Sequence, residues 1–212
     1  VDLTKPQINI SKLNYIKQSG KKSEVNFNLN FVPNKNLNIT KLLFLSGKTE
    51  IDLSELKLNK DFEINDFKKI KVKTFNKDKQ NNDFLVKKSN TVNISGKIFD
   101  AQPLLKSLFK KDDRKNFSKK FSNEIKINFD RAITGTNDDV SDFGMIAFIN
   151  KGSFEKLSLK GNFTENEIIE MSIYKTGNDK KTLQVISDRA RPFMKNFDFI
   201  KGFEEGKLEY ES

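Results

Sequence analysis

The feature that most constrains this chain is a strict alternation of apolar and polar side chains, which recurs along its length. Two segments show it most clearly. Their apolar members are Val25, Phe27, Leu29 and Phe31 in the first segment and Ile125, Ile127 and Phe129 in the second. A period of two residues sends successive side chains to opposite faces of an extended backbone. Each segment therefore predicts a β-strand with one apolar face and one polar face.

Similar segments follow one another along the chain, with short turn-like stretches such as Asn150-Lys151-Gly152 between them. Short turns between successive strands favour an antiparallel sheet over a parallel sheet with crossover helices. We expect further strands at residues 38–46, 49–58, 68–75, 83–88, 91–99, 142–150, 154–163, 167–175, 182–187 and 206–210.

Two stretches break the alternation. Residues 101–109 and 189–197 place leucine, phenylalanine and methionine at helical spacing, and each has a proline near its start, where a missing N–H costs little. Asp100 and Asp188 precede them as expected N-caps. The two stretches also align with each other. We therefore predict a tandem unit of several strands followed by one short helix.

The expected fold is mainly β with a few short helices (α+β). It is a curled antiparallel β-sheet in two tandem strand-rich units, each ending in a short amphipathic helix. The first unit is expected over residues 1–110, a connection over 111–122 and the second unit over 123–212. The apolar face either packs against the helices as a closed core or stays open as an apolar trough. The same apolar residues would line a closed core or an open trough, so the sequence does not decide between the two arrangements.

The chain contains no cysteine and no histidine. It therefore lacks the thiolate, which binds metals and acts as a nucleophile, and the imidazole that most often serves as a general base near neutral pH. Asp138, Asp139 and Asp142 do not have the spacing of a calcium loop, so they predict a solvated acidic turn. We expect no enzymatic activity, no catalytic residue, no cofactor and no bound metal ion.

The chain carries 39 basic and 29 acidic residues, a formal net charge of +10. All the basic residues except Arg114, Arg131, Arg189 and Arg191 are lysines. Arginine is preferred for bidentate contacts with phosphate and guanine, whereas lysine is a solvated point charge. Nucleic acid is therefore a disfavoured partner, and an anionic membrane surface stays open as a partner.

Residues 94–108, with the sequence ISGKIFDAQPLLKSL, resemble a characteristic segment of the AsmA-like superfamily, in particular of the YhdP-like bacterial envelope proteins. Residues 154–161 are similar to a strand motif of these proteins that ends in glycine, and residues 186–190 and 202–208 resemble their C-terminal pattern. Arg189 interrupts the usual Asp-Ala-Gly of that pattern, and residues 203–205 separate its paired glycines.

The resemblance implies a segment of a longer protein that is anchored in the inner membrane and lies mostly in the periplasm. In that family a curled β-sheet with an apolar trough is thought to carry phospholipid between the inner and outer membranes. The expected function is therefore phospholipid binding and conduction, with the remaining segments of the parent chain and phospholipid acyl chains as partners. The candidate lipid-contacting residues are Val25, Phe27, Leu29, Phe31, Ile125, Ile127 and Phe129. The alternative is a structural or assembly domain of the cell envelope with a filled core and no lipid.

Overall fold

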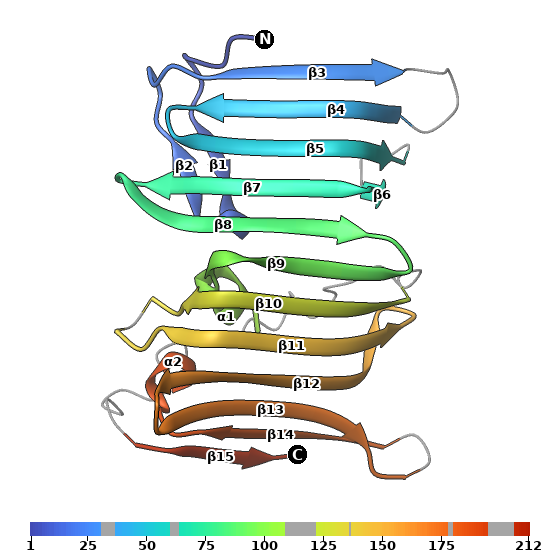
Figure 1. Cartoon of the computed structure of the whole chain (residues 1–212), viewed down its shortest axis with the longest axis vertical. Helices are drawn as coiled ribbons and strands as arrows, with labels where there is room; N and C mark the ends of the chain where they lie inside the picture. Colours follow the sequence, from blue (N-terminus) through green and yellow to red (C-terminus); the bar gives the residue numbers. More distant parts are fainter. Residues whose placement is uncertain (31–36, 60–63, 109–121, 136, 178–179, 195–205) are drawn as a thin grey trace. The chain divides into compact units, whose positions relative to one another are not determined.

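The structure, a computed structural model, describes residues 1–30, 37–59, 64–108, 122–135, 137–177, 180–194 and 206–212. The chain forms two compact units, Val1–Ser89 (unit 1) and Asn90–Ser212 (unit 2). Both units are mainly β, as the alternation predicts, and the strand order of each can be followed in Figure 1.

Unit 1 is built on a sheet of antiparallel strands. Its order is β3-β4-β5-β7-β8, the short β6 pairs with β5, and β1 and β2 form a separate two-stranded hairpin closed by a 3-10 turn, η1. The elements are β1 (Ile8–Ile10), η1 (Ser11–Leu13), β2 (Tyr15–Lys17), β3 (Glu24–Asn30), β4 (Leu37–Ser46), β5 (Thr49–Leu58), β6 (Ile64–Asp66), β7 (Lys69–Asn76) and β8 (Lys79–Lys88).

β8 begins at Lys79, earlier than the predicted start at residue 83. The turn before it is only Lys77 and Asp78, with φ of 46° and 64°, which is the backbone of a tight hairpin turn. The first residues of β8 are polar, so alternation does not reveal them. Asn82 is nevertheless fully buried, because its Nδ2 donates to Leu13 O at 2.8 Å and to Thr74 Oγ1 at 2.9 Å.

Unit 2 contains one sheet in the order β9-β10-β11-β12-β13-β14-β15. Every neighbouring pair after β10 is antiparallel. The elements are β9 (Thr91–Asp100), α1 (Gln102–Leu108), β10 (Asn123–Ile133), β11 (Val140–Asn150), β12 (Ser153–Thr164), β13 (Glu167–Lys175), β14 (Lys181–Ser187), α2 (Arg191–Met194) and β15 (Leu208–Glu211).

β9 and β10 run parallel, with Ile94 beside Ile127 and Gly96 beside Phe129. The prediction of antiparallel pairing is wrong for these two strands. Parallel neighbours need a crossover connection that returns the chain to the starting end of the sheet, and residues 101–122, which include α1, supply it. The pairing with β10 also places β9 and α1 in unit 2, although the sequence analysis grouped them with the first unit.

Short helices begin within both predicted helical stretches, and residues 109 and 195–197 lie outside the described residues. At the start of α1, the N–H of Gln102 donates to Asp100 Oδ1 at 3.2 Å, as an N-cap requires. Asp188 instead accepts the N–H of Ile168 at 2.8 Å. In the described part of the chain, no helix has both the length and the apolarity needed to cross a bilayer.

Candidate functional site

The residues predicted to contact lipid fall in both units. Val25, Phe27 and Leu29 lie on β3 in unit 1, Ile125, Ile127 and Phe129 lie on β10 in unit 2, and Phe31 lies outside the described residues. Within each described group, the alternation puts all three side chains on one face of the sheet of its own unit.

In unit 2, Ile127 belongs to a row of side chains that crosses the sheet from β9 to β15. Strand register places the members next to one another on successive strands, and we call them the central row: Ile94, Ile127, Met145, Leu159, Met171, Val185 and Tyr210. Neighbouring strands are about 4.8 Å apart, so the row extends over about 29 Å. Its first five members are half-buried, and none of the seven carries a charge.

Buried side chains lie on both sides of the central row. Ile125 and Phe129 are 6% and 4% exposed, and the Phe129 ring stacks on Phe99 with 5.0 Å between the ring centroids. Val92 and Ala147, the neighbours of Ile125 across the strands, are buried as well. Of the three candidates on β10, the outer two therefore fill the core, and only Ile127 is left partly accessible.

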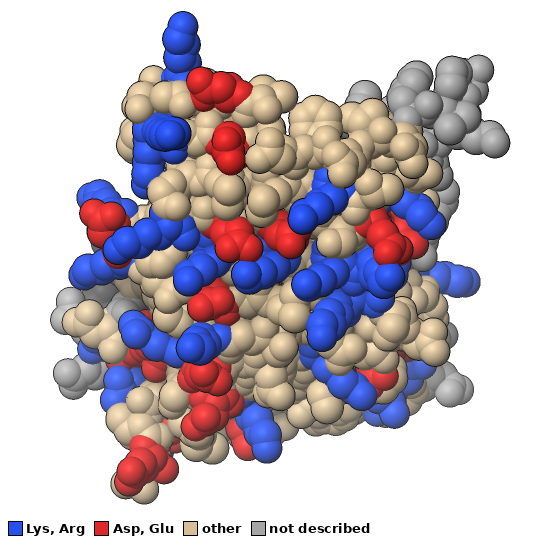
Figure 2. Space-filling view, turned by 45° about the horizontal axis from the view of Figure 1, so that its top comes forward, with Lys and Arg blue, Asp and Glu red and all other residues tan. Residues whose placement is uncertain are grey.

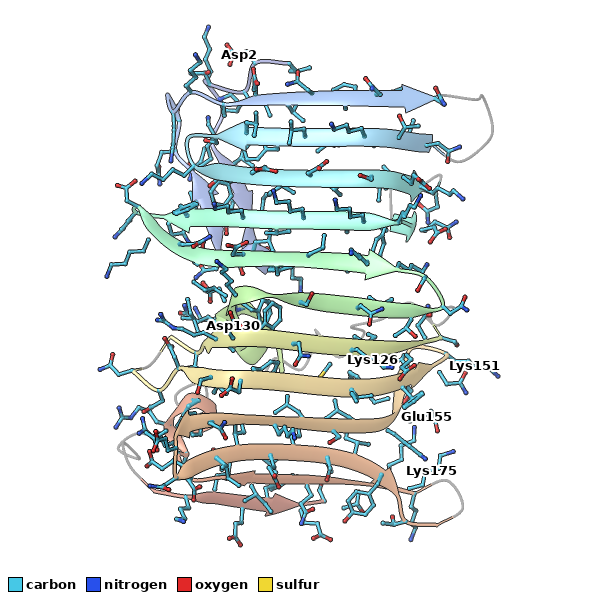
Figure 3. All side chains as sticks on the ribbon, viewed as in Figure 1. Asp2, Lys126, Asp130, Lys151, Glu155 and Lys175 are labelled. Carbon is cyan, nitrogen blue, oxygen red and sulfur yellow. The ribbon has the colours of Figure 1, made fainter. Side chains whose placement is uncertain are left out.

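The opposite face of unit 2 is mostly polar. Lys126, Asn128 and Asp130 alternate with the candidates on β10, and Figure 3 shows Lys126 and Asp130 along β10 on the face turned to the viewer. This face also carries exposed apolar side chains, each 36% to 48% exposed: Ile146, Phe148, Ile168, Tyr174 and Ile186. On β10, the apolar candidates therefore lie on one face of the sheet and polar side chains lie on the other face.

A lysine pair marks one end of the apolar face. Lys175 lies directly opposite Lys181, two residues beyond Ile173 and Leu183 on β13 and β14. Both ammonium groups contact the carboxylate of Glu155, at 2.9 Å and 3.0 Å, and these hydrogen bonds lower the pKa of Glu155. Figure 3 shows Glu155 and Lys175 at the same end of the strands. Two ammonium groups therefore share one carboxylate where the apolar face ends.

A charged cluster holds the other end of unit 2 together. Arg189, just before α2, donates to Asp138 Oδ1 at 2.7 Å and to the carboxylate of Glu167. Arg191 Nε lies 3.6 Å from Asp138 Oδ2, and the Arg189 guanidinium lies over the ring of Phe163. Asp138 is only 5% exposed, so the prediction of a solvated acidic turn is wrong at this position.

These contacts set the protonation of the cluster. Hydrogen bonds from Arg189 and Thr164 lower the pKa of Glu167, and the same contacts with Glu167 and Asp138 raise the pKa of Arg189. A hydrogen bond from Lys207 lowers the pKa of Asp188. The carboxylates of Glu167 and Asp188 are thus held in their charged form by neighbouring cations, which stabilises the fold.

In unit 1, the candidate residues lie on an edge strand. β3 is the last strand of the order, and 43% of Phe27 and 44% of Leu29 are exposed. Val25 is half-buried because the N-terminal segment covers its end of the apolar face (Figure 1). There Tyr15 packs with Phe44 and Ile51, and seven partly buried apolar side chains pack against these three: Leu3, Ile8, Ile10, Leu13, Val25, Leu42 and Leu53.

A buried lysine fastens this N-terminal segment. Lys17 is fully buried, and its Nζ donates to the carbonyl oxygens of Leu3 at 2.6 Å, Thr4 at 2.8 Å and Pro6 at 2.6 Å. No strand was expected in residues 1–22, although they belong to the first expected unit. The available signal was the apolar spacing of Ile8 and Ile10 before Tyr15, which predicts a short strand with one apolar face.

Two pockets in the described part of unit 1 do not include the candidate residues. One of about 660 Å³ is lined mainly by polar residues around Asp2, Lys22 and Glu24. A second, of about 360 Å³, lies between Glu55 and Lys88. Within the residues that the structure describes, no group of three acidic side chains is placed to hold a metal ion. These two pockets are therefore separate from the apolar face that carries the candidate residues of unit 1.

Comparison with protein-family models, with curated proteins and with solved structures found no match to this chain.

Proposed function

We propose that this chain binds phospholipid acyl chains on the apolar faces of its sheets, as a periplasmic segment of an AsmA-like envelope protein that conducts lipid between the inner and outer membranes. The longer protein would be anchored in the inner membrane outside this segment. The observation that carries the proposal is the central row of unit 2, an uncharged row that crosses seven strands and is half-buried over its first five members.

The size and chemistry of the row suit an acyl chain. One leaflet of a bilayer contributes about half of a hydrocarbon core of about 30 Å, so an acyl chain is about 15 Å long and the row of about 29 Å is sufficient for it. Removing each CH₂ from water contributes about 0.8 kcal/mol. Binding of this kind needs no catalytic residue, which agrees with the absence of cysteine and histidine from the sequence.

The resemblance of residues 94–108 to the AsmA-like superfamily gives the proposal its biological setting. These residues form β9 and α1, and β9 supplies Ile94 to the central row. The segment that carries the resemblance is thus part of the proposed lipid surface.

A structural or assembly domain without lipid is the second candidate. It is favoured by the burial of Ile125, Phe129 and Ala147 within unit 2, since a sheet that fills its own core can serve as a spacer in the envelope. The two functions differ in whether the central row is occupied by lipid.

Phospholipid that co-purifies with the protein tests the proposal. The full chain is extracted with organic solvent and its phospholipid is counted by mass spectrometry, for the unchanged protein and for Met145→Gln. Glutamine has nearly the shape of methionine but is polar, so it weakens acyl binding at the third position of the row while the strand is retained. We expect the bound phospholipid to fall severalfold.

Ile146→Gln is the matched control, because Ile146 is the next residue on β11 and is exposed on the opposite face. Circular dichroism verifies that both variants keep their β content. Equal phospholipid in both variants, or none in the unchanged protein, would contradict lipid binding on this row and favour the structural domain.

A further inference from the structure

A second surface, on the polar face of unit 1, carries a row of lysines. The strand register places Lys41 on β4 next to Ser54 on β5, Ser54 next to Lys69 on β7, and Lys69 next to Lys87 on β8. We call these four residues the lysine row. It contains no acidic residue, and in the described part of unit 1 none of its lysines forms an ion pair.

This arrangement differs from the rest of the same face. In the next row Lys71 lies opposite Asp52 and is bonded to Glu50 at 2.9 Å, so its charge is balanced. Lys69 and Lys87 lie directly opposite each other, and like charges in that position destabilise a sheet. Figure 2 shows basic side chains gathered on this face with acidic side chains between them. An external anion would relieve the repulsion that the fold leaves in place.

The geometry favours an extended anionic surface over a single phosphate. Two strand spacings, about 10 Å, separate Lys41 from Lys69, and one spacing of about 5 Å separates Lys69 from Lys87. Such lysines form a line across the sheet and do not converge on one point. The headgroups of a bilayer present negative charge over a plane, which a line of lysines can follow.

Two further observations favour a membrane over nucleic acid. Unit 1 contains no arginine, the residue preferred for phosphate and base contacts in nucleic acids. The neighbouring row of this face also carries Leu43 and Leu85, which are only half-buried. Leucines beside lysines suit the boundary between headgroups and acyl chains.

We propose that the lysine row docks unit 1 on an anionic phospholipid membrane. The docking uses the polar face, whereas the proposed acyl binding uses the apolar face. It deepens the proposed function by giving the lipid-binding segment a contact with the membrane. Each lysine near an anionic surface strengthens binding about fivefold, and salt weakens the attraction.

Vesicle co-sedimentation of the full chain tests the proposal, with vesicles of phosphatidylcholine alone and of phosphatidylcholine mixed with phosphatidylglycerol. We expect binding to the mixed vesicles only, decreasing with added salt. The triple variant Lys41→Gln, Lys69→Gln and Lys87→Gln should bind about 100-fold more weakly. The control triple Lys5→Gln, Lys12→Gln and Lys22→Gln removes the same charge from exposed positions outside the row and should lose less than fivefold.

Equal losses in the two triple variants would overturn the proposal, because they would assign the attraction to net charge. Equal binding to the neutral vesicles, or tighter binding to duplex DNA than to the mixed vesicles, would overturn it as well. Membrane docking and acyl binding can fail independently. A variant that no longer binds vesicles can still co-purify with phospholipid, and a variant that lacks co-purified phospholipid can still bind vesicles.

Ser54→Asp provides an independent check that does not remove a lysine. A carboxylate at residue 54 lies between Lys41 and Lys69 and forms ion pairs across the strands, so the folded state is retained or stabilised. The same carboxylate repels the membrane. We expect unchanged or higher thermal stability together with vesicle binding at least fivefold weaker; unchanged vesicle binding would refute the docking site.

Discussion

Arg189 Nη1 lies 2.7 Å from Asp138 Oδ1, although the two residues are 51 positions apart in the chain. The contact joins the segment before α2 to the loop between β10 and β11, and Glu167 ties the same guanidinium to the first residue of β13. One side chain thus ties three segments together at one end of unit 2.

Replacing Arg189 with methionine should lower the free energy of unfolding by about 1–2 kcal/mol, because the buried Asp138 loses a charged partner while the contact with Phe163 is kept. Urea denaturation measures the change. Arg131→Met is the matched control, since the Arg131–Asp139 pair is exposed on the arginine side and should contribute less than about 1 kcal/mol. Equal losses in the two variants would show that the burial of Asp138 has no effect.

The folded state should lose stability as the pH becomes acidic. Glu167 and Asp188 have pKa values lowered by Arg189 and Lys207, so the folded state favours their charged forms. In the unfolded chain the pKa is about 4.3 for Glu and about 3.9 for Asp. At a pH above these values a carboxylate with a lowered folded-state pKa stabilises the folded protein. This stabilisation is lost as the pH falls through the folded-state pKa. Urea midpoints should be constant near neutral pH and decrease below about pH 4.5.

Glu167→Gln removes one of these carboxylates and should make the acid decrease shallower than in the unchanged protein. Glu165→Gln is the control, because Glu165 is exposed in the turn before β13. An acid profile that is identical in all three proteins would contradict the role assigned to Glu167.

Lys17→Met should release the N-terminal segment from unit 1. The substitution leaves the carbonyl oxygens of Leu3, Thr4 and Pro6 without their shared donor, at a cost of about 2–4 kcal/mol. Hydrogen exchange should become faster in β1 and β2 and stay unchanged in β10–β14. Lys12→Met, at an exposed position, should change neither region; loss of protection in both variants would contradict this account.

Gly161→Ala should destabilise unit 2 by about 1–3 kcal/mol, because the added Cβ overlaps Cγ1 of Val140. Val140→Ala removes the overlapping methyl group but leaves a cavity of its own. The double variant should therefore be more stable than the sum of the two single changes predicts. Thermal unfolding of the four proteins measures this coupling, and strictly additive changes would refute the contact.

Local alternation predicted most of the strands. The predicted range 49–58 is β5, Thr49–Leu58, and the range 167–175 is β13, Glu167–Lys175. Each of these strands has one apolar face, so the pattern and the fold agree. β9 was also predicted, but its parallel pairing with β10 was not, because a strand pattern does not specify which neighbour it will meet.

The residues missed by the sequence analysis depend on distant contacts. Lys17 is of a type that is almost always exposed, and the three carbonyl groups that accept hydrogen bonds from its Nζ make its burial favourable. Asp138 is predicted as solvated because its partner, Arg189, is far away in the chain. The candidate list also treated Ile125, Ile127 and Phe129 alike, whereas burial by neighbouring strands distinguishes Ile127 from the other two.

The most direct test of lipid binding is photo-crosslinking in cells that make the full protein, with the reactive amino acid placed at Ile127 in one variant and at Asn128 in the other. Residue 127 lies on the central row and residue 128 on the opposite face of the same strand. We predict phospholipid adducts at residue 127 well above those at residue 128, with Phe27 and Asn28 as the corresponding pair on β3. Equal or absent labelling at residues 127 and 128 would contradict an apolar face that carries lipid.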